Sequence, residues 1–376
     1  MKNFRLWSMM LIVLIFTNCE QGKAQSSKKS ETKIQVAILL DTSNSMDGLI
    51  DQAKSRLWNI VNTLTTLKFK GKTPEIEIAL YEYGNDNLSS KSGYIRKVTP
   101  LTTDLDLISE KLFSLKTNGG SEYCGAVIQN ATNNLEWGTN EADMKLIYIA
   151  GNESFNQGEI DYKKAIKNAL TKNIYINTIY CGDYNYGIQE LWQSGAIEGK
   201  GKYFNIDSNA RVEFVSTPYD DRISVCNERL NKTYISYGAS GSAKQMNQAA
   251  QDKNAASLSS ANYAERVVSK SKAVYKNDSW DLVDKANEDP KALKTIDKKE
   301  LPKELQNKST EEIQALVEKK AKERTEIQKE IAQLAKQRQE YIDSEQQKKG
   351  NQDDLGNAIN SSVLAFAKSK GYEVEK

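Results

Sequence analysis

The chain of 376 residues is long enough for two domains, and its 52 lysine and arginine residues nearly balance 50 aspartate and glutamate residues. A net charge of only +2 predicts no broad attraction to nucleic acid or to an anionic membrane surface. The sequence contains no histidine, which excludes Ser–His–Asp hydrolases, zincins and facial-triad iron enzymes.

The first 24 residues have the pattern of a secretory signal. A basic start precedes an apolar run over residues 6–16, shorter than the roughly 20 residues of a membrane-spanning helix, and the chain then turns polar. Two processing routes fit this pattern: lipidation of Cys19, or cleavage after Ala24. The polar residues 25–32 then form a tether. We therefore expect an exported protein of the bacterial cell envelope, either periplasmic or anchored to the membrane through Cys19.

Residues 33–207 alternate between buried strands and amphipathic helices. Apolar runs rich in β-branched residues predict strands at 34–40, 76–83, 94–98, 145–150, 174–180 and 203–206. Apolar side chains at three- and four-residue spacing predict helices at 49–64, 105–115, 126–137, 162–170 and 187–197. This alternation predicts an α/β fold with a doubly wound, mainly parallel sheet of six strands. In such folds ligands bind beyond the carboxyl ends of the strands.

Three oxygen-bearing side chains follow the first predicted strand directly. Asp41, Ser43 and Ser45 lie in a short loop between that strand and an amphipathic helix. A carboxylate and two hydroxyls, without nitrogen or sulfur, suit a hard cation such as Mg²⁺. The same residue types also cap the N-termini of helices, so capping is the alternative interpretation.

The spacing Asp-x-Ser-x-Ser at this place resembles the start of the metal-ion-dependent adhesion site in the von Willebrand factor A family. The resemblance covers about residues 33–207 and implies a second, glycine-containing loop with a third hydroxyl, which matches residues 118–123. Glycines there let the backbone approach an ion closely. The metal ligands that the resemblance implies are Asp41, Ser43, Ser45 and Ser121.

The third element of the family's site departs from the pattern. Gly151 stands where the family usually carries an aspartate after its fourth strand. The loss of one carboxylate weakens the attraction for a divalent cation. Asn152, Glu153 or Glu122 could compensate; otherwise the site is vestigial and its loops bind a partner without metal.

Two cysteines belong to the same rim of the predicted sheet as these loops. Cys124 begins a helix and Cys181 ends a strand. In an exported protein they could form a disulfide, and the alternative is that both are buried free thiols. Cys226 has no obvious partner, and the absence of Cys-x-x-Cys spacing argues against a zinc or redox motif.

Residues 208–376 are predicted to be helical. The stretch 238–262 has few apolar anchors and indicates a loosely held helix or a linker. Ser309 and Glu312 form a capping box before a long charged helix near 310–345, and a further amphipathic helix covers 355–367.

The apolar seam of the long helix is interrupted by Lys320, Arg324 and Arg338. Such a seam fits a helical hairpin packed on neighbouring helices, or a coiled coil with another chain. The simplest interpretation is a solvated structural arm. The mixed charges of this helix indicate a wetted surface rather than a nucleic-acid interface.

These features favour an exported binding module over an enzyme. The first domain would hold Mg²⁺, whose open coordination position takes a carboxylate from a protein partner. The alternative is a structural envelope protein that keeps the fold without the ion and uses the helical arm for assembly. No activated nucleophile or poised base is recognisable, so we expect no catalysis.

Overall fold

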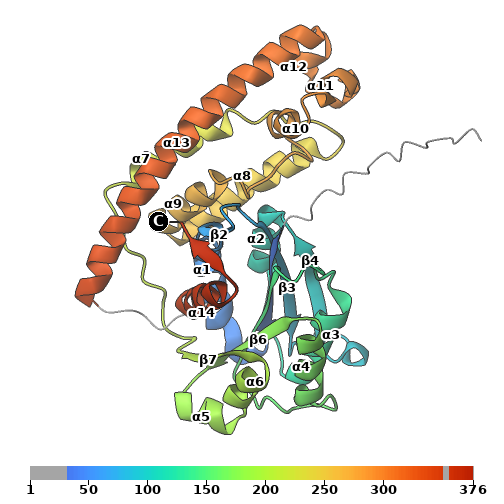
Figure 1. The fold of residues 1–376 in the computed structure, drawn as a ribbon, viewed down its shortest axis with the longest axis vertical. Coiled ribbons are helices and arrows are strands. Elements are labelled where there is room, and N and C mark those ends of the chain that lie inside the picture. The colour runs from blue at the N-terminus through green and yellow to red at the C-terminus, as the bar shows by residue number, and fades with distance from the viewer. Residues whose placement is uncertain (1–31, 350–354, 376) are drawn as a thin grey trace, which may run out of the picture. The chain divides into compact units, whose positions relative to one another are not determined.

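The computed structural model describes residues 32–349 and 355–375, and its centre is a six-stranded sheet with helices on both faces (Figure 1). The strand order is β4-β3-β1-β5-β6-β7, and only β4 runs antiparallel to its neighbour. The strands are β1 (Lys33–Asp41), β3 (Glu75–Tyr83), β4 (Ile95–Thr102), β5 (Met144–Gly151), β6 (Ile174–Cys181) and β7 (Lys200–Ile206). The predicted α/β fold with a doubly wound, mainly parallel sheet of six strands is confirmed.

Alternate side chains of β1 enter two separate cores, one on each face of the sheet. Ile34, Val36 and Leu40 pack on one face, and Ala37 and Leu39 pack on the other. Because both faces are covered, the strand reads as a continuous apolar run in the sequence. The first face is covered by α1 (Asp47–Thr65), α2 (Leu105–Ser114) and α14 (Leu355–Ser369), and the second by α3 (Cys124–Asn134), α4 (Tyr162–Thr171) and α6 (Trp192–Glu198).

The single helix predicted over 187–197 is two short helices, α5 (Tyr184–Gln189) and α6. The chain breaks between them at Leu191, whose φ of +68° lies in the left-handed region. Trp192 follows and is fully buried; its indole N–H donates to the carbonyl of Glu153 at 2.7 Å, and its own carbonyl accepts from Thr178 Oγ1 at 2.7 Å. These tertiary contacts outweigh the local preference for one continuous helix.

After β7 the described chain is helical until its last short strand. The helices are α7 (Asp220–Asn231), α8 (Gly241–Leu258), α9 (Ser260–Lys270), α10 (Leu282–Glu288), α11 (Ala292–Thr295), α12 (Lys303–Gln306), α13 (Thr310–Lys349) and α14. Short 3-10 helices cover Asn44–Met46 (η1), Ser90–Ser92 (η2) and Lys298–Glu300 (η3). A second, antiparallel sheet joins β2 (Leu67–Phe69), which follows α1, to β8 (Tyr372–Val374). The predicted helical region is therefore confirmed.

The long helix α13 begins at the predicted capping box. Ser309 Oγ accepts from the backbone N–H of Glu312 at 3.2 Å, and Glu312 Oε2 accepts from the N–H of Ser309 at 2.8 Å. The reciprocal bonds satisfy two N–H groups that would otherwise lack partners at the helix start.

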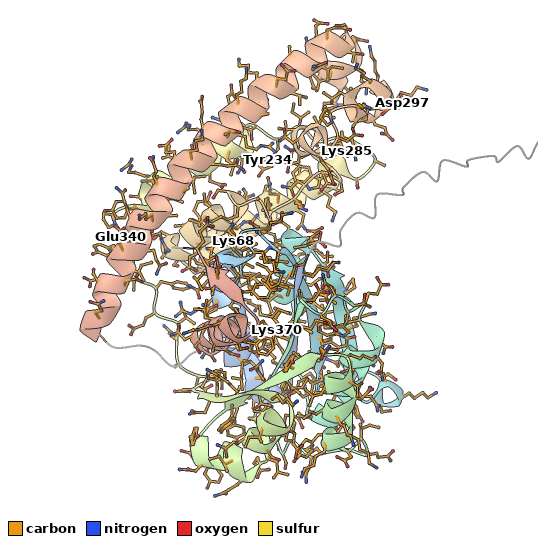
Figure 2. The ribbon with its side chains drawn as sticks, viewed as in Figure 1. Lys68, Tyr234, Lys285, Asp297, Glu340 and Lys370 are labelled. Atoms are coloured by element: carbon orange, nitrogen blue, oxygen red, sulfur yellow. The ribbon has the colours of Figure 1, made fainter. Side chains whose placement is uncertain are left out.

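The interrupted seam of α13 packs against helices of the same chain. Arg324 Nη1 donates to Asp281 Oδ2 at 2.7 Å, and Arg338 Nε donates to Asp220 Oδ1 at 2.9 Å. The guanidinium of Arg324 also lies over the ring of Tyr234, 4.3 Å from its centroid. Tyr234 is labelled in Figure 2. Because these arginines pair with buried carboxylates of their own chain, the contacts favour packing on neighbouring helices and give a coiled coil with another chain no support.

The stretch 238–262 contains α8 and the start of α9, and α8 is packed against other helices rather than being loosely held or a linker. Gln248, Gln251 and Asp252 on α8 are all buried. Gln251 Oε1 accepts from Ser109 Oγ of α2 at 2.8 Å, and Gln248 Nε2 donates to the hydroxyl of Tyr275 at 3.2 Å. The sequence shows few apolar anchors because this helix is held by buried amide and carboxylate groups.

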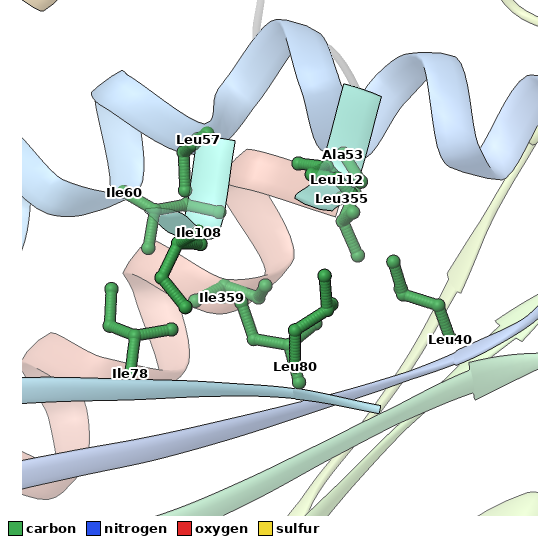
Figure 3. Close-up of a pocket in the computed structure, with 11 residues that line it drawn as sticks. Leu40, Ala53, Leu57, Ile60, Ile78, Leu80, Ile108, Leu112, Leu355 and Ile359 are labelled. Atoms are coloured by element: carbon green, nitrogen blue, oxygen red, sulfur yellow. The ribbon is translucent and has the colours of Figure 1, made fainter. Parts of the chain in front are cut away.

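The last helix, α14, completes the layer beside α1. Ser362 of α14 donates to Asn177 Oδ1 at 2.8 Å and accepts from the hydroxyl of Tyr148 at 3.0 Å, so the helix is bonded to β5 and β6. Leu355 and Ile359 close a small apolar cavity between α14, α1, α2 and the sheet (Figure 3). The sheet therefore depends on a helix from the far end of the sequence for part of its cover.

The predicted signal at 1–24, with Cys19 and Ala24, and the tether up to residue 31 lie outside the described residues. Within the described ranges, no helix combines the length and apolar character needed to cross a membrane.

Candidate metal site

The central strand β1 delivers Asp41 to a buried position at its carboxyl end. β1 lies between β3 and β5, and its last residue, Asp41, is fully buried. Asp41 Oδ1 accepts a hydrogen bond from the backbone N–H of Ser43 at 2.7 Å. Asp41 Oδ2 is also buried and has no hydrogen-bond partner. A buried carboxylate oxygen without a donor or a cation is energetically costly. This oxygen is therefore the strongest structural indication of a ligand site in the loop.

The electrostatic surroundings of Asp41 disfavour its ionised form. Burial raises the pKa of Asp41 to about 7; hydrogen bonds from Ser43 oppose the rise, and the charges of Glu122 and Glu153 add to it. Burial also raises the pKa of Glu122. Neither Asp41 nor Glu122 has a lysine or arginine partner among the residues that the structure describes. A bound divalent cation would restore the ionised forms of both carboxyl groups.

The hydroxyls of Ser43 and Ser45 lie beside each other, with their oxygens 3.4 Å apart. Ser43 precedes η1, yet its side chain makes no capping hydrogen bond, and no side chain caps α1 either. The Ser43 and Ser45 hydroxyls therefore do not cap η1 or α1, and the alternative interpretation as helix caps is not supported. Asn152, which follows β5, donates from Nδ2 to Ser45 Oγ at 3.1 Å. The loop after β5 thus contacts the loop after β1.

The second predicted loop, residues 118–123, lies directly against the first. The backbone N–H of Asn118 donates to the carbonyl of Thr42 at 3.0 Å, and the N–H of Asn44 donates to the carbonyl of Gly119 at 2.9 Å. These two bonds join segments that are more than seventy residues apart in the sequence. The loop between α2 and α3 therefore meets the loop after β1 at the carboxyl end of that strand.

Ser121 itself is half-buried and lies just before α3. Among the described residues, no hydrogen bond links its hydroxyl to Asp41, Ser43 or Ser45. The structure places the loop of Ser121 beside the other three residues through backbone bonds, and its role as a ligand stays a prediction.

Glu122 was one of three residues, with Asn152 and Glu153, that could compensate for the missing aspartate, and the structure places its side chain. It is 6% exposed, although glutamate next to a glycine-rich loop would ordinarily face solvent. A hydrogen bond with the Ser43 side chain partly offsets the effect of burial on the pKa of Glu122. The only sequence signal was its place next to Ser121, because the fold alone determines that its side chain turns inward.

The departure at Gly151 has a structural counterpart in Tyr83. A Cβ atom at Gly151 would lie 2.6 Å from the Tyr83 hydroxyl oxygen and 3.0 Å from Asp41 Oδ2. Tyr83, the last residue of β3, is fully buried and donates to the carbonyl of Ala150 at 3.0 Å. The tyrosine therefore occupies the volume next to Asp41 that a side chain at position 151 would need.

The three cysteines in the described ranges, Cys124, Cys181 and Cys226, are buried free thiols. Cys124 Sγ lies 3.9 Å from the Tyr83 hydroxyl. The alternative of a Cys124–Cys181 disulfide is not what the structure contains, and both thiols act as small apolar groups beneath the loops.

The oxygen set of these loops fits a hard divalent cation better than a transition metal. The groups near Asp41 are carboxylates, hydroxyls and one amide, which are ligands for Mg²⁺ or Mn²⁺. Within the described ranges, no three His, Cys, Asp or Glu side chains gather closely enough to hold an ion by themselves. Any ion at this place must therefore use serine hydroxyls as well as carboxylates.

Residues 35–218 match the family model of the von Willebrand factor type A domain. This part of the chain is therefore a von Willebrand factor A domain, and the resemblance drawn from the sequence is confirmed. Domains of this family serve in adhesion and protein interaction. A comparison with curated proteins finds no match to the chain.

Several solved structures are similar to the chain. BatB from Bacteroides thetaiotaomicron is 19% identical and matches 46% of this chain and 90% of its own, with a TM-score of 0.36. An aerotolerance-related membrane protein from Bacteroides fragilis is 18% identical over 47% and 93% of the two chains, with a TM-score of 0.33. Proximal thread matrix protein 1 from the mussel byssus, with a zinc-occupied MIDAS motif, is 13% identical over 45% and 48%, with a TM-score of 0.32.

Proposed function

We propose that the von Willebrand factor A domain binds a divalent cation, Mg²⁺, through Asp41, Ser43, Ser45 and Ser121. The observation that carries this proposal is the buried Oδ2 of Asp41, which has no hydrogen-bond partner. It lies in the same loop as two neighbouring hydroxyls that make no capping bonds. Charge, hydroxyl oxygens and an unsatisfied buried acceptor are together what a hard cation requires.

The bound ion would give the domain a way to hold a protein partner. Mg²⁺ keeps open or water-filled coordination positions, and a carboxylate from a partner can take one of them. Asp41 supplies the charge that retains the ion, and the serine hydroxyls supply neutral oxygens. The domain then acts as an interaction module and not as an enzyme, since no residue in the described part of the chain is recognisable as an activated nucleophile.

The second candidate is a scaffold protein of the cell envelope that works without the ion. Its support is the replacement of a family carboxylate by Gly151, whose side-chain space Tyr83 fills. In this alternative the helical region from α7 to α13 would serve assembly. The cell envelope is the proposed location in both cases, because residues 1–24 have the pattern of an export signal, with Cys19 or Ala24 as the processing point.

Titration calorimetry of the purified protein with Mg²⁺ and Mn²⁺ tests the proposal. We expect one binding site per chain, which Asp41→Ala removes and Asp51→Ala leaves unchanged. Asp51 is a matched control because its side chain is 75% exposed on α1 and pairs with Lys54. Equal heats from the protein and from Asp41→Ala would overturn the metal site and leave the scaffold alternative.

A further inference from the structure

We propose that Glu122 supplies the second carboxylate of this metal site, in place of the carboxylate that is absent at Gly151. This inference rests on the proposed cation binding and assigns a ligand to the same site. The von Willebrand pattern alone points to position 151, whereas the contacts of this chain point to the opposite side of Asp41, where β3 ends and the second loop begins.

The side chain of Glu122 folds back over its own loop and towards Asp41. A Cβ atom on Gly120 would lie 2.6 Å from Glu122 Oε1, so the carboxylate covers that glycine. A Cβ atom on Gly84 would lie 2.8 Å from Glu122 Cγ and 2.9 Å from Asp41 Oδ1. Both acidic side chains therefore border the same point in space, above the end of β3.

Two glycines make room for this arrangement. Gly84 follows β3 with a φ of +77°, and any side chain there would collide with Glu122 or Asp41. Gly120 has no side chain at the place where the Glu122 carboxylate lies. The space at both positions is thus used by an acidic group, although glutamate is rarely buried without a partner.

On the side of Asp41 that faces Gly151 there is no space for a second carboxylate. Tyr83 fills it, and its hydroxyl is already bonded to the carbonyl of Ala150 at 3.0 Å. A second carboxylate can therefore approach Asp41 from the Glu122 side but not from the Gly151 side. Two carboxylates and the Ser43 and Ser45 hydroxyls match the charge and the oxygen preference of one divalent cation.

Two neighbouring buried carboxylates without an ion pair repel each other. Asp41 is fully buried and Glu122 is 6% exposed, and Asp41 Oδ2 has no partner. A cation shared by both groups removes this repulsion. If Glu122 only shaped the loop before α3, its negative charge would destabilise the folded protein and would not contribute to ion binding.

Removing the charge of Glu122 should therefore have opposite effects on two quantities. It should maintain or raise the stability of the metal-free protein, and it should lower the affinity for the metal ion. Glu122→Gln keeps the shape and removes the repulsion, so we expect the metal-free variant to unfold at the same temperature as the wild-type protein or a higher one. Its Mn²⁺ affinity, measured by calorimetry, should fall about tenfold or more. The rise in unfolding temperature on adding Mn²⁺ should shrink accordingly. Glu159, which is exposed in the loop after β5, supplies the control. Glu159→Gln should have the Mn²⁺ affinity and the unfolding temperature of the wild-type protein.

Gly120→Ala provides a second test that leaves every charge in place. Its Cβ would displace the Glu122 carboxylate, so Mn²⁺ affinity should also fall, and this variant serves if Glu122→Gln does not fold. Wild-type affinity in both variants, with binding still abolished by Asp41→Ala, would overturn the role of Glu122 and leave the proposed metal site intact. Absence of Mn²⁺ binding by the wild-type protein would overturn both.

Discussion

The volume next to Asp41 is decided by single atoms of Gly151 and Tyr83. The Tyr83 hydroxyl is buried, bonded to the Ala150 carbonyl, and 2.6 Å from where a Cβ at Gly151 would stand. Cβ atoms do not approach oxygen so closely, so the tyrosine at position 83 requires glycine at position 151. Restoring an aspartate at 151 alone would therefore not rebuild the family pattern while Tyr83 is present.

Gly151→Ala is expected to lower the free energy of unfolding by about 1–3 kcal/mol, because the added methyl collides with the Tyr83 hydroxyl. In a Tyr83→Phe background the same change should cost less, since the closest contact is gone. Tyr83→Phe alone should cost about 1 kcal/mol through its lost hydrogen bond. Urea unfolding of the four proteins measures the coupling. Equal costs of Gly151→Ala in both backgrounds would show that the two side chains do not compete for space.

The residues of the site were predictable only in part. Asp41, Ser43 and Ser45 could be placed because a loop that leaves a buried strand must lie at the carboxyl edge of the sheet. The second loop around Ser121 could be placed beside them only through the family resemblance, because it joins two helices and does not follow a strand. The inward turn of Glu122 and the Tyr83 hydroxyl could not, because both depend on which side chains meet across β1, β3 and β5.

The helices after β7 are joined through buried charges as well as through apolar side chains. On α13, Arg324 bonds to Asp281 at 2.7 Å and to the backbone carbonyl of Thr233 at 3.0 Å. On α9, Arg266 is fully buried and bonds to Asp106 of α2 at 2.8 Å. Hydrophobic periodicity predicts such helices but does not identify the residues that they contact, because a buried, paired charge cannot be told from a solvent-exposed one in the apolar pattern.

Arg324→Met should destabilise the protein by about 3–5 kcal/mol, because Asp281 is fully buried and would lose its cation. Arg229→Met is the matched control. Arg229 also joins α13, through Glu330 at 2.6 Å, but both side chains are more than one third exposed, and water screens the pair to about 1 kcal/mol or less. Urea midpoints of the two variants measure the difference. Similar small losses would mean that the Arg324 cluster is better hydrated than its burial indicates.

The junction of α8 and α9 should give a distinct acid response. Burial opposes ionisation of Asp252, but Lys270 and Arg266 outweigh it and hold the pKa of this carboxyl well below its usual range. Stability from this ionised group is complete above about pH 4, the pKa in the unfolded chain, and is lost as the pH falls further towards the lowered folded value.

Asp252→Asn should therefore cost about 3–5 kcal/mol at pH 7, because it leaves the buried Lys270 without its carboxylate. The difference in the free energy of unfolding between the variant and the wild-type protein should become smaller below about pH 4, because the wild-type protein then loses the stabilisation from ionised Asp252. Urea unfolding at pH 7, 4 and 3 tests this, with Asp51→Asn as an exposed control. A gap that stays constant with pH would show that Asp252 does not carry the effect as a charge.

At the scale of the whole molecule, the sheet and the helical region are interleaved along the sequence. Residues after β7 form α7 to α13, and the chain then returns to the sheet as α14 and β8. β8 pairs with β2, which follows α1, and α14 packs into the core that contains α1 and α2. The sequence predicted the helix over 355–367 as amphipathic but not its partner, because an apolar stripe does not identify the surface that it covers.

The cover that α14 gives to the sheet predicts that a protein ending at residue 207 will not fold cooperatively. Leu355 and Ile359 face apolar residues of α1, α2 and the sheet (Figure 3), so the truncation exposes that surface to water. The shortened protein should bind a hydrophobic dye and lack a sharp thermal transition. A cooperative transition without dye binding would show instead that residues 33–207 are an independent domain.

Point changes in the full chain separate the loss of this cover from other effects of truncation. Ile359→Ala removes a fully buried side chain and should cost about 2–5 kcal/mol, through lost apolar contact and an enlarged cavity. Lys368→Ala, at an exposed position of the same helix, should change the free energy of unfolding by less than about 0.5 kcal/mol. A loss in the free energy of unfolding as small for Ile359→Ala as for Lys368→Ala, with Mg²⁺ binding retained, would contradict this prediction. It would show that the sheet and its metal-binding loops are stable without the contacts that α14 makes.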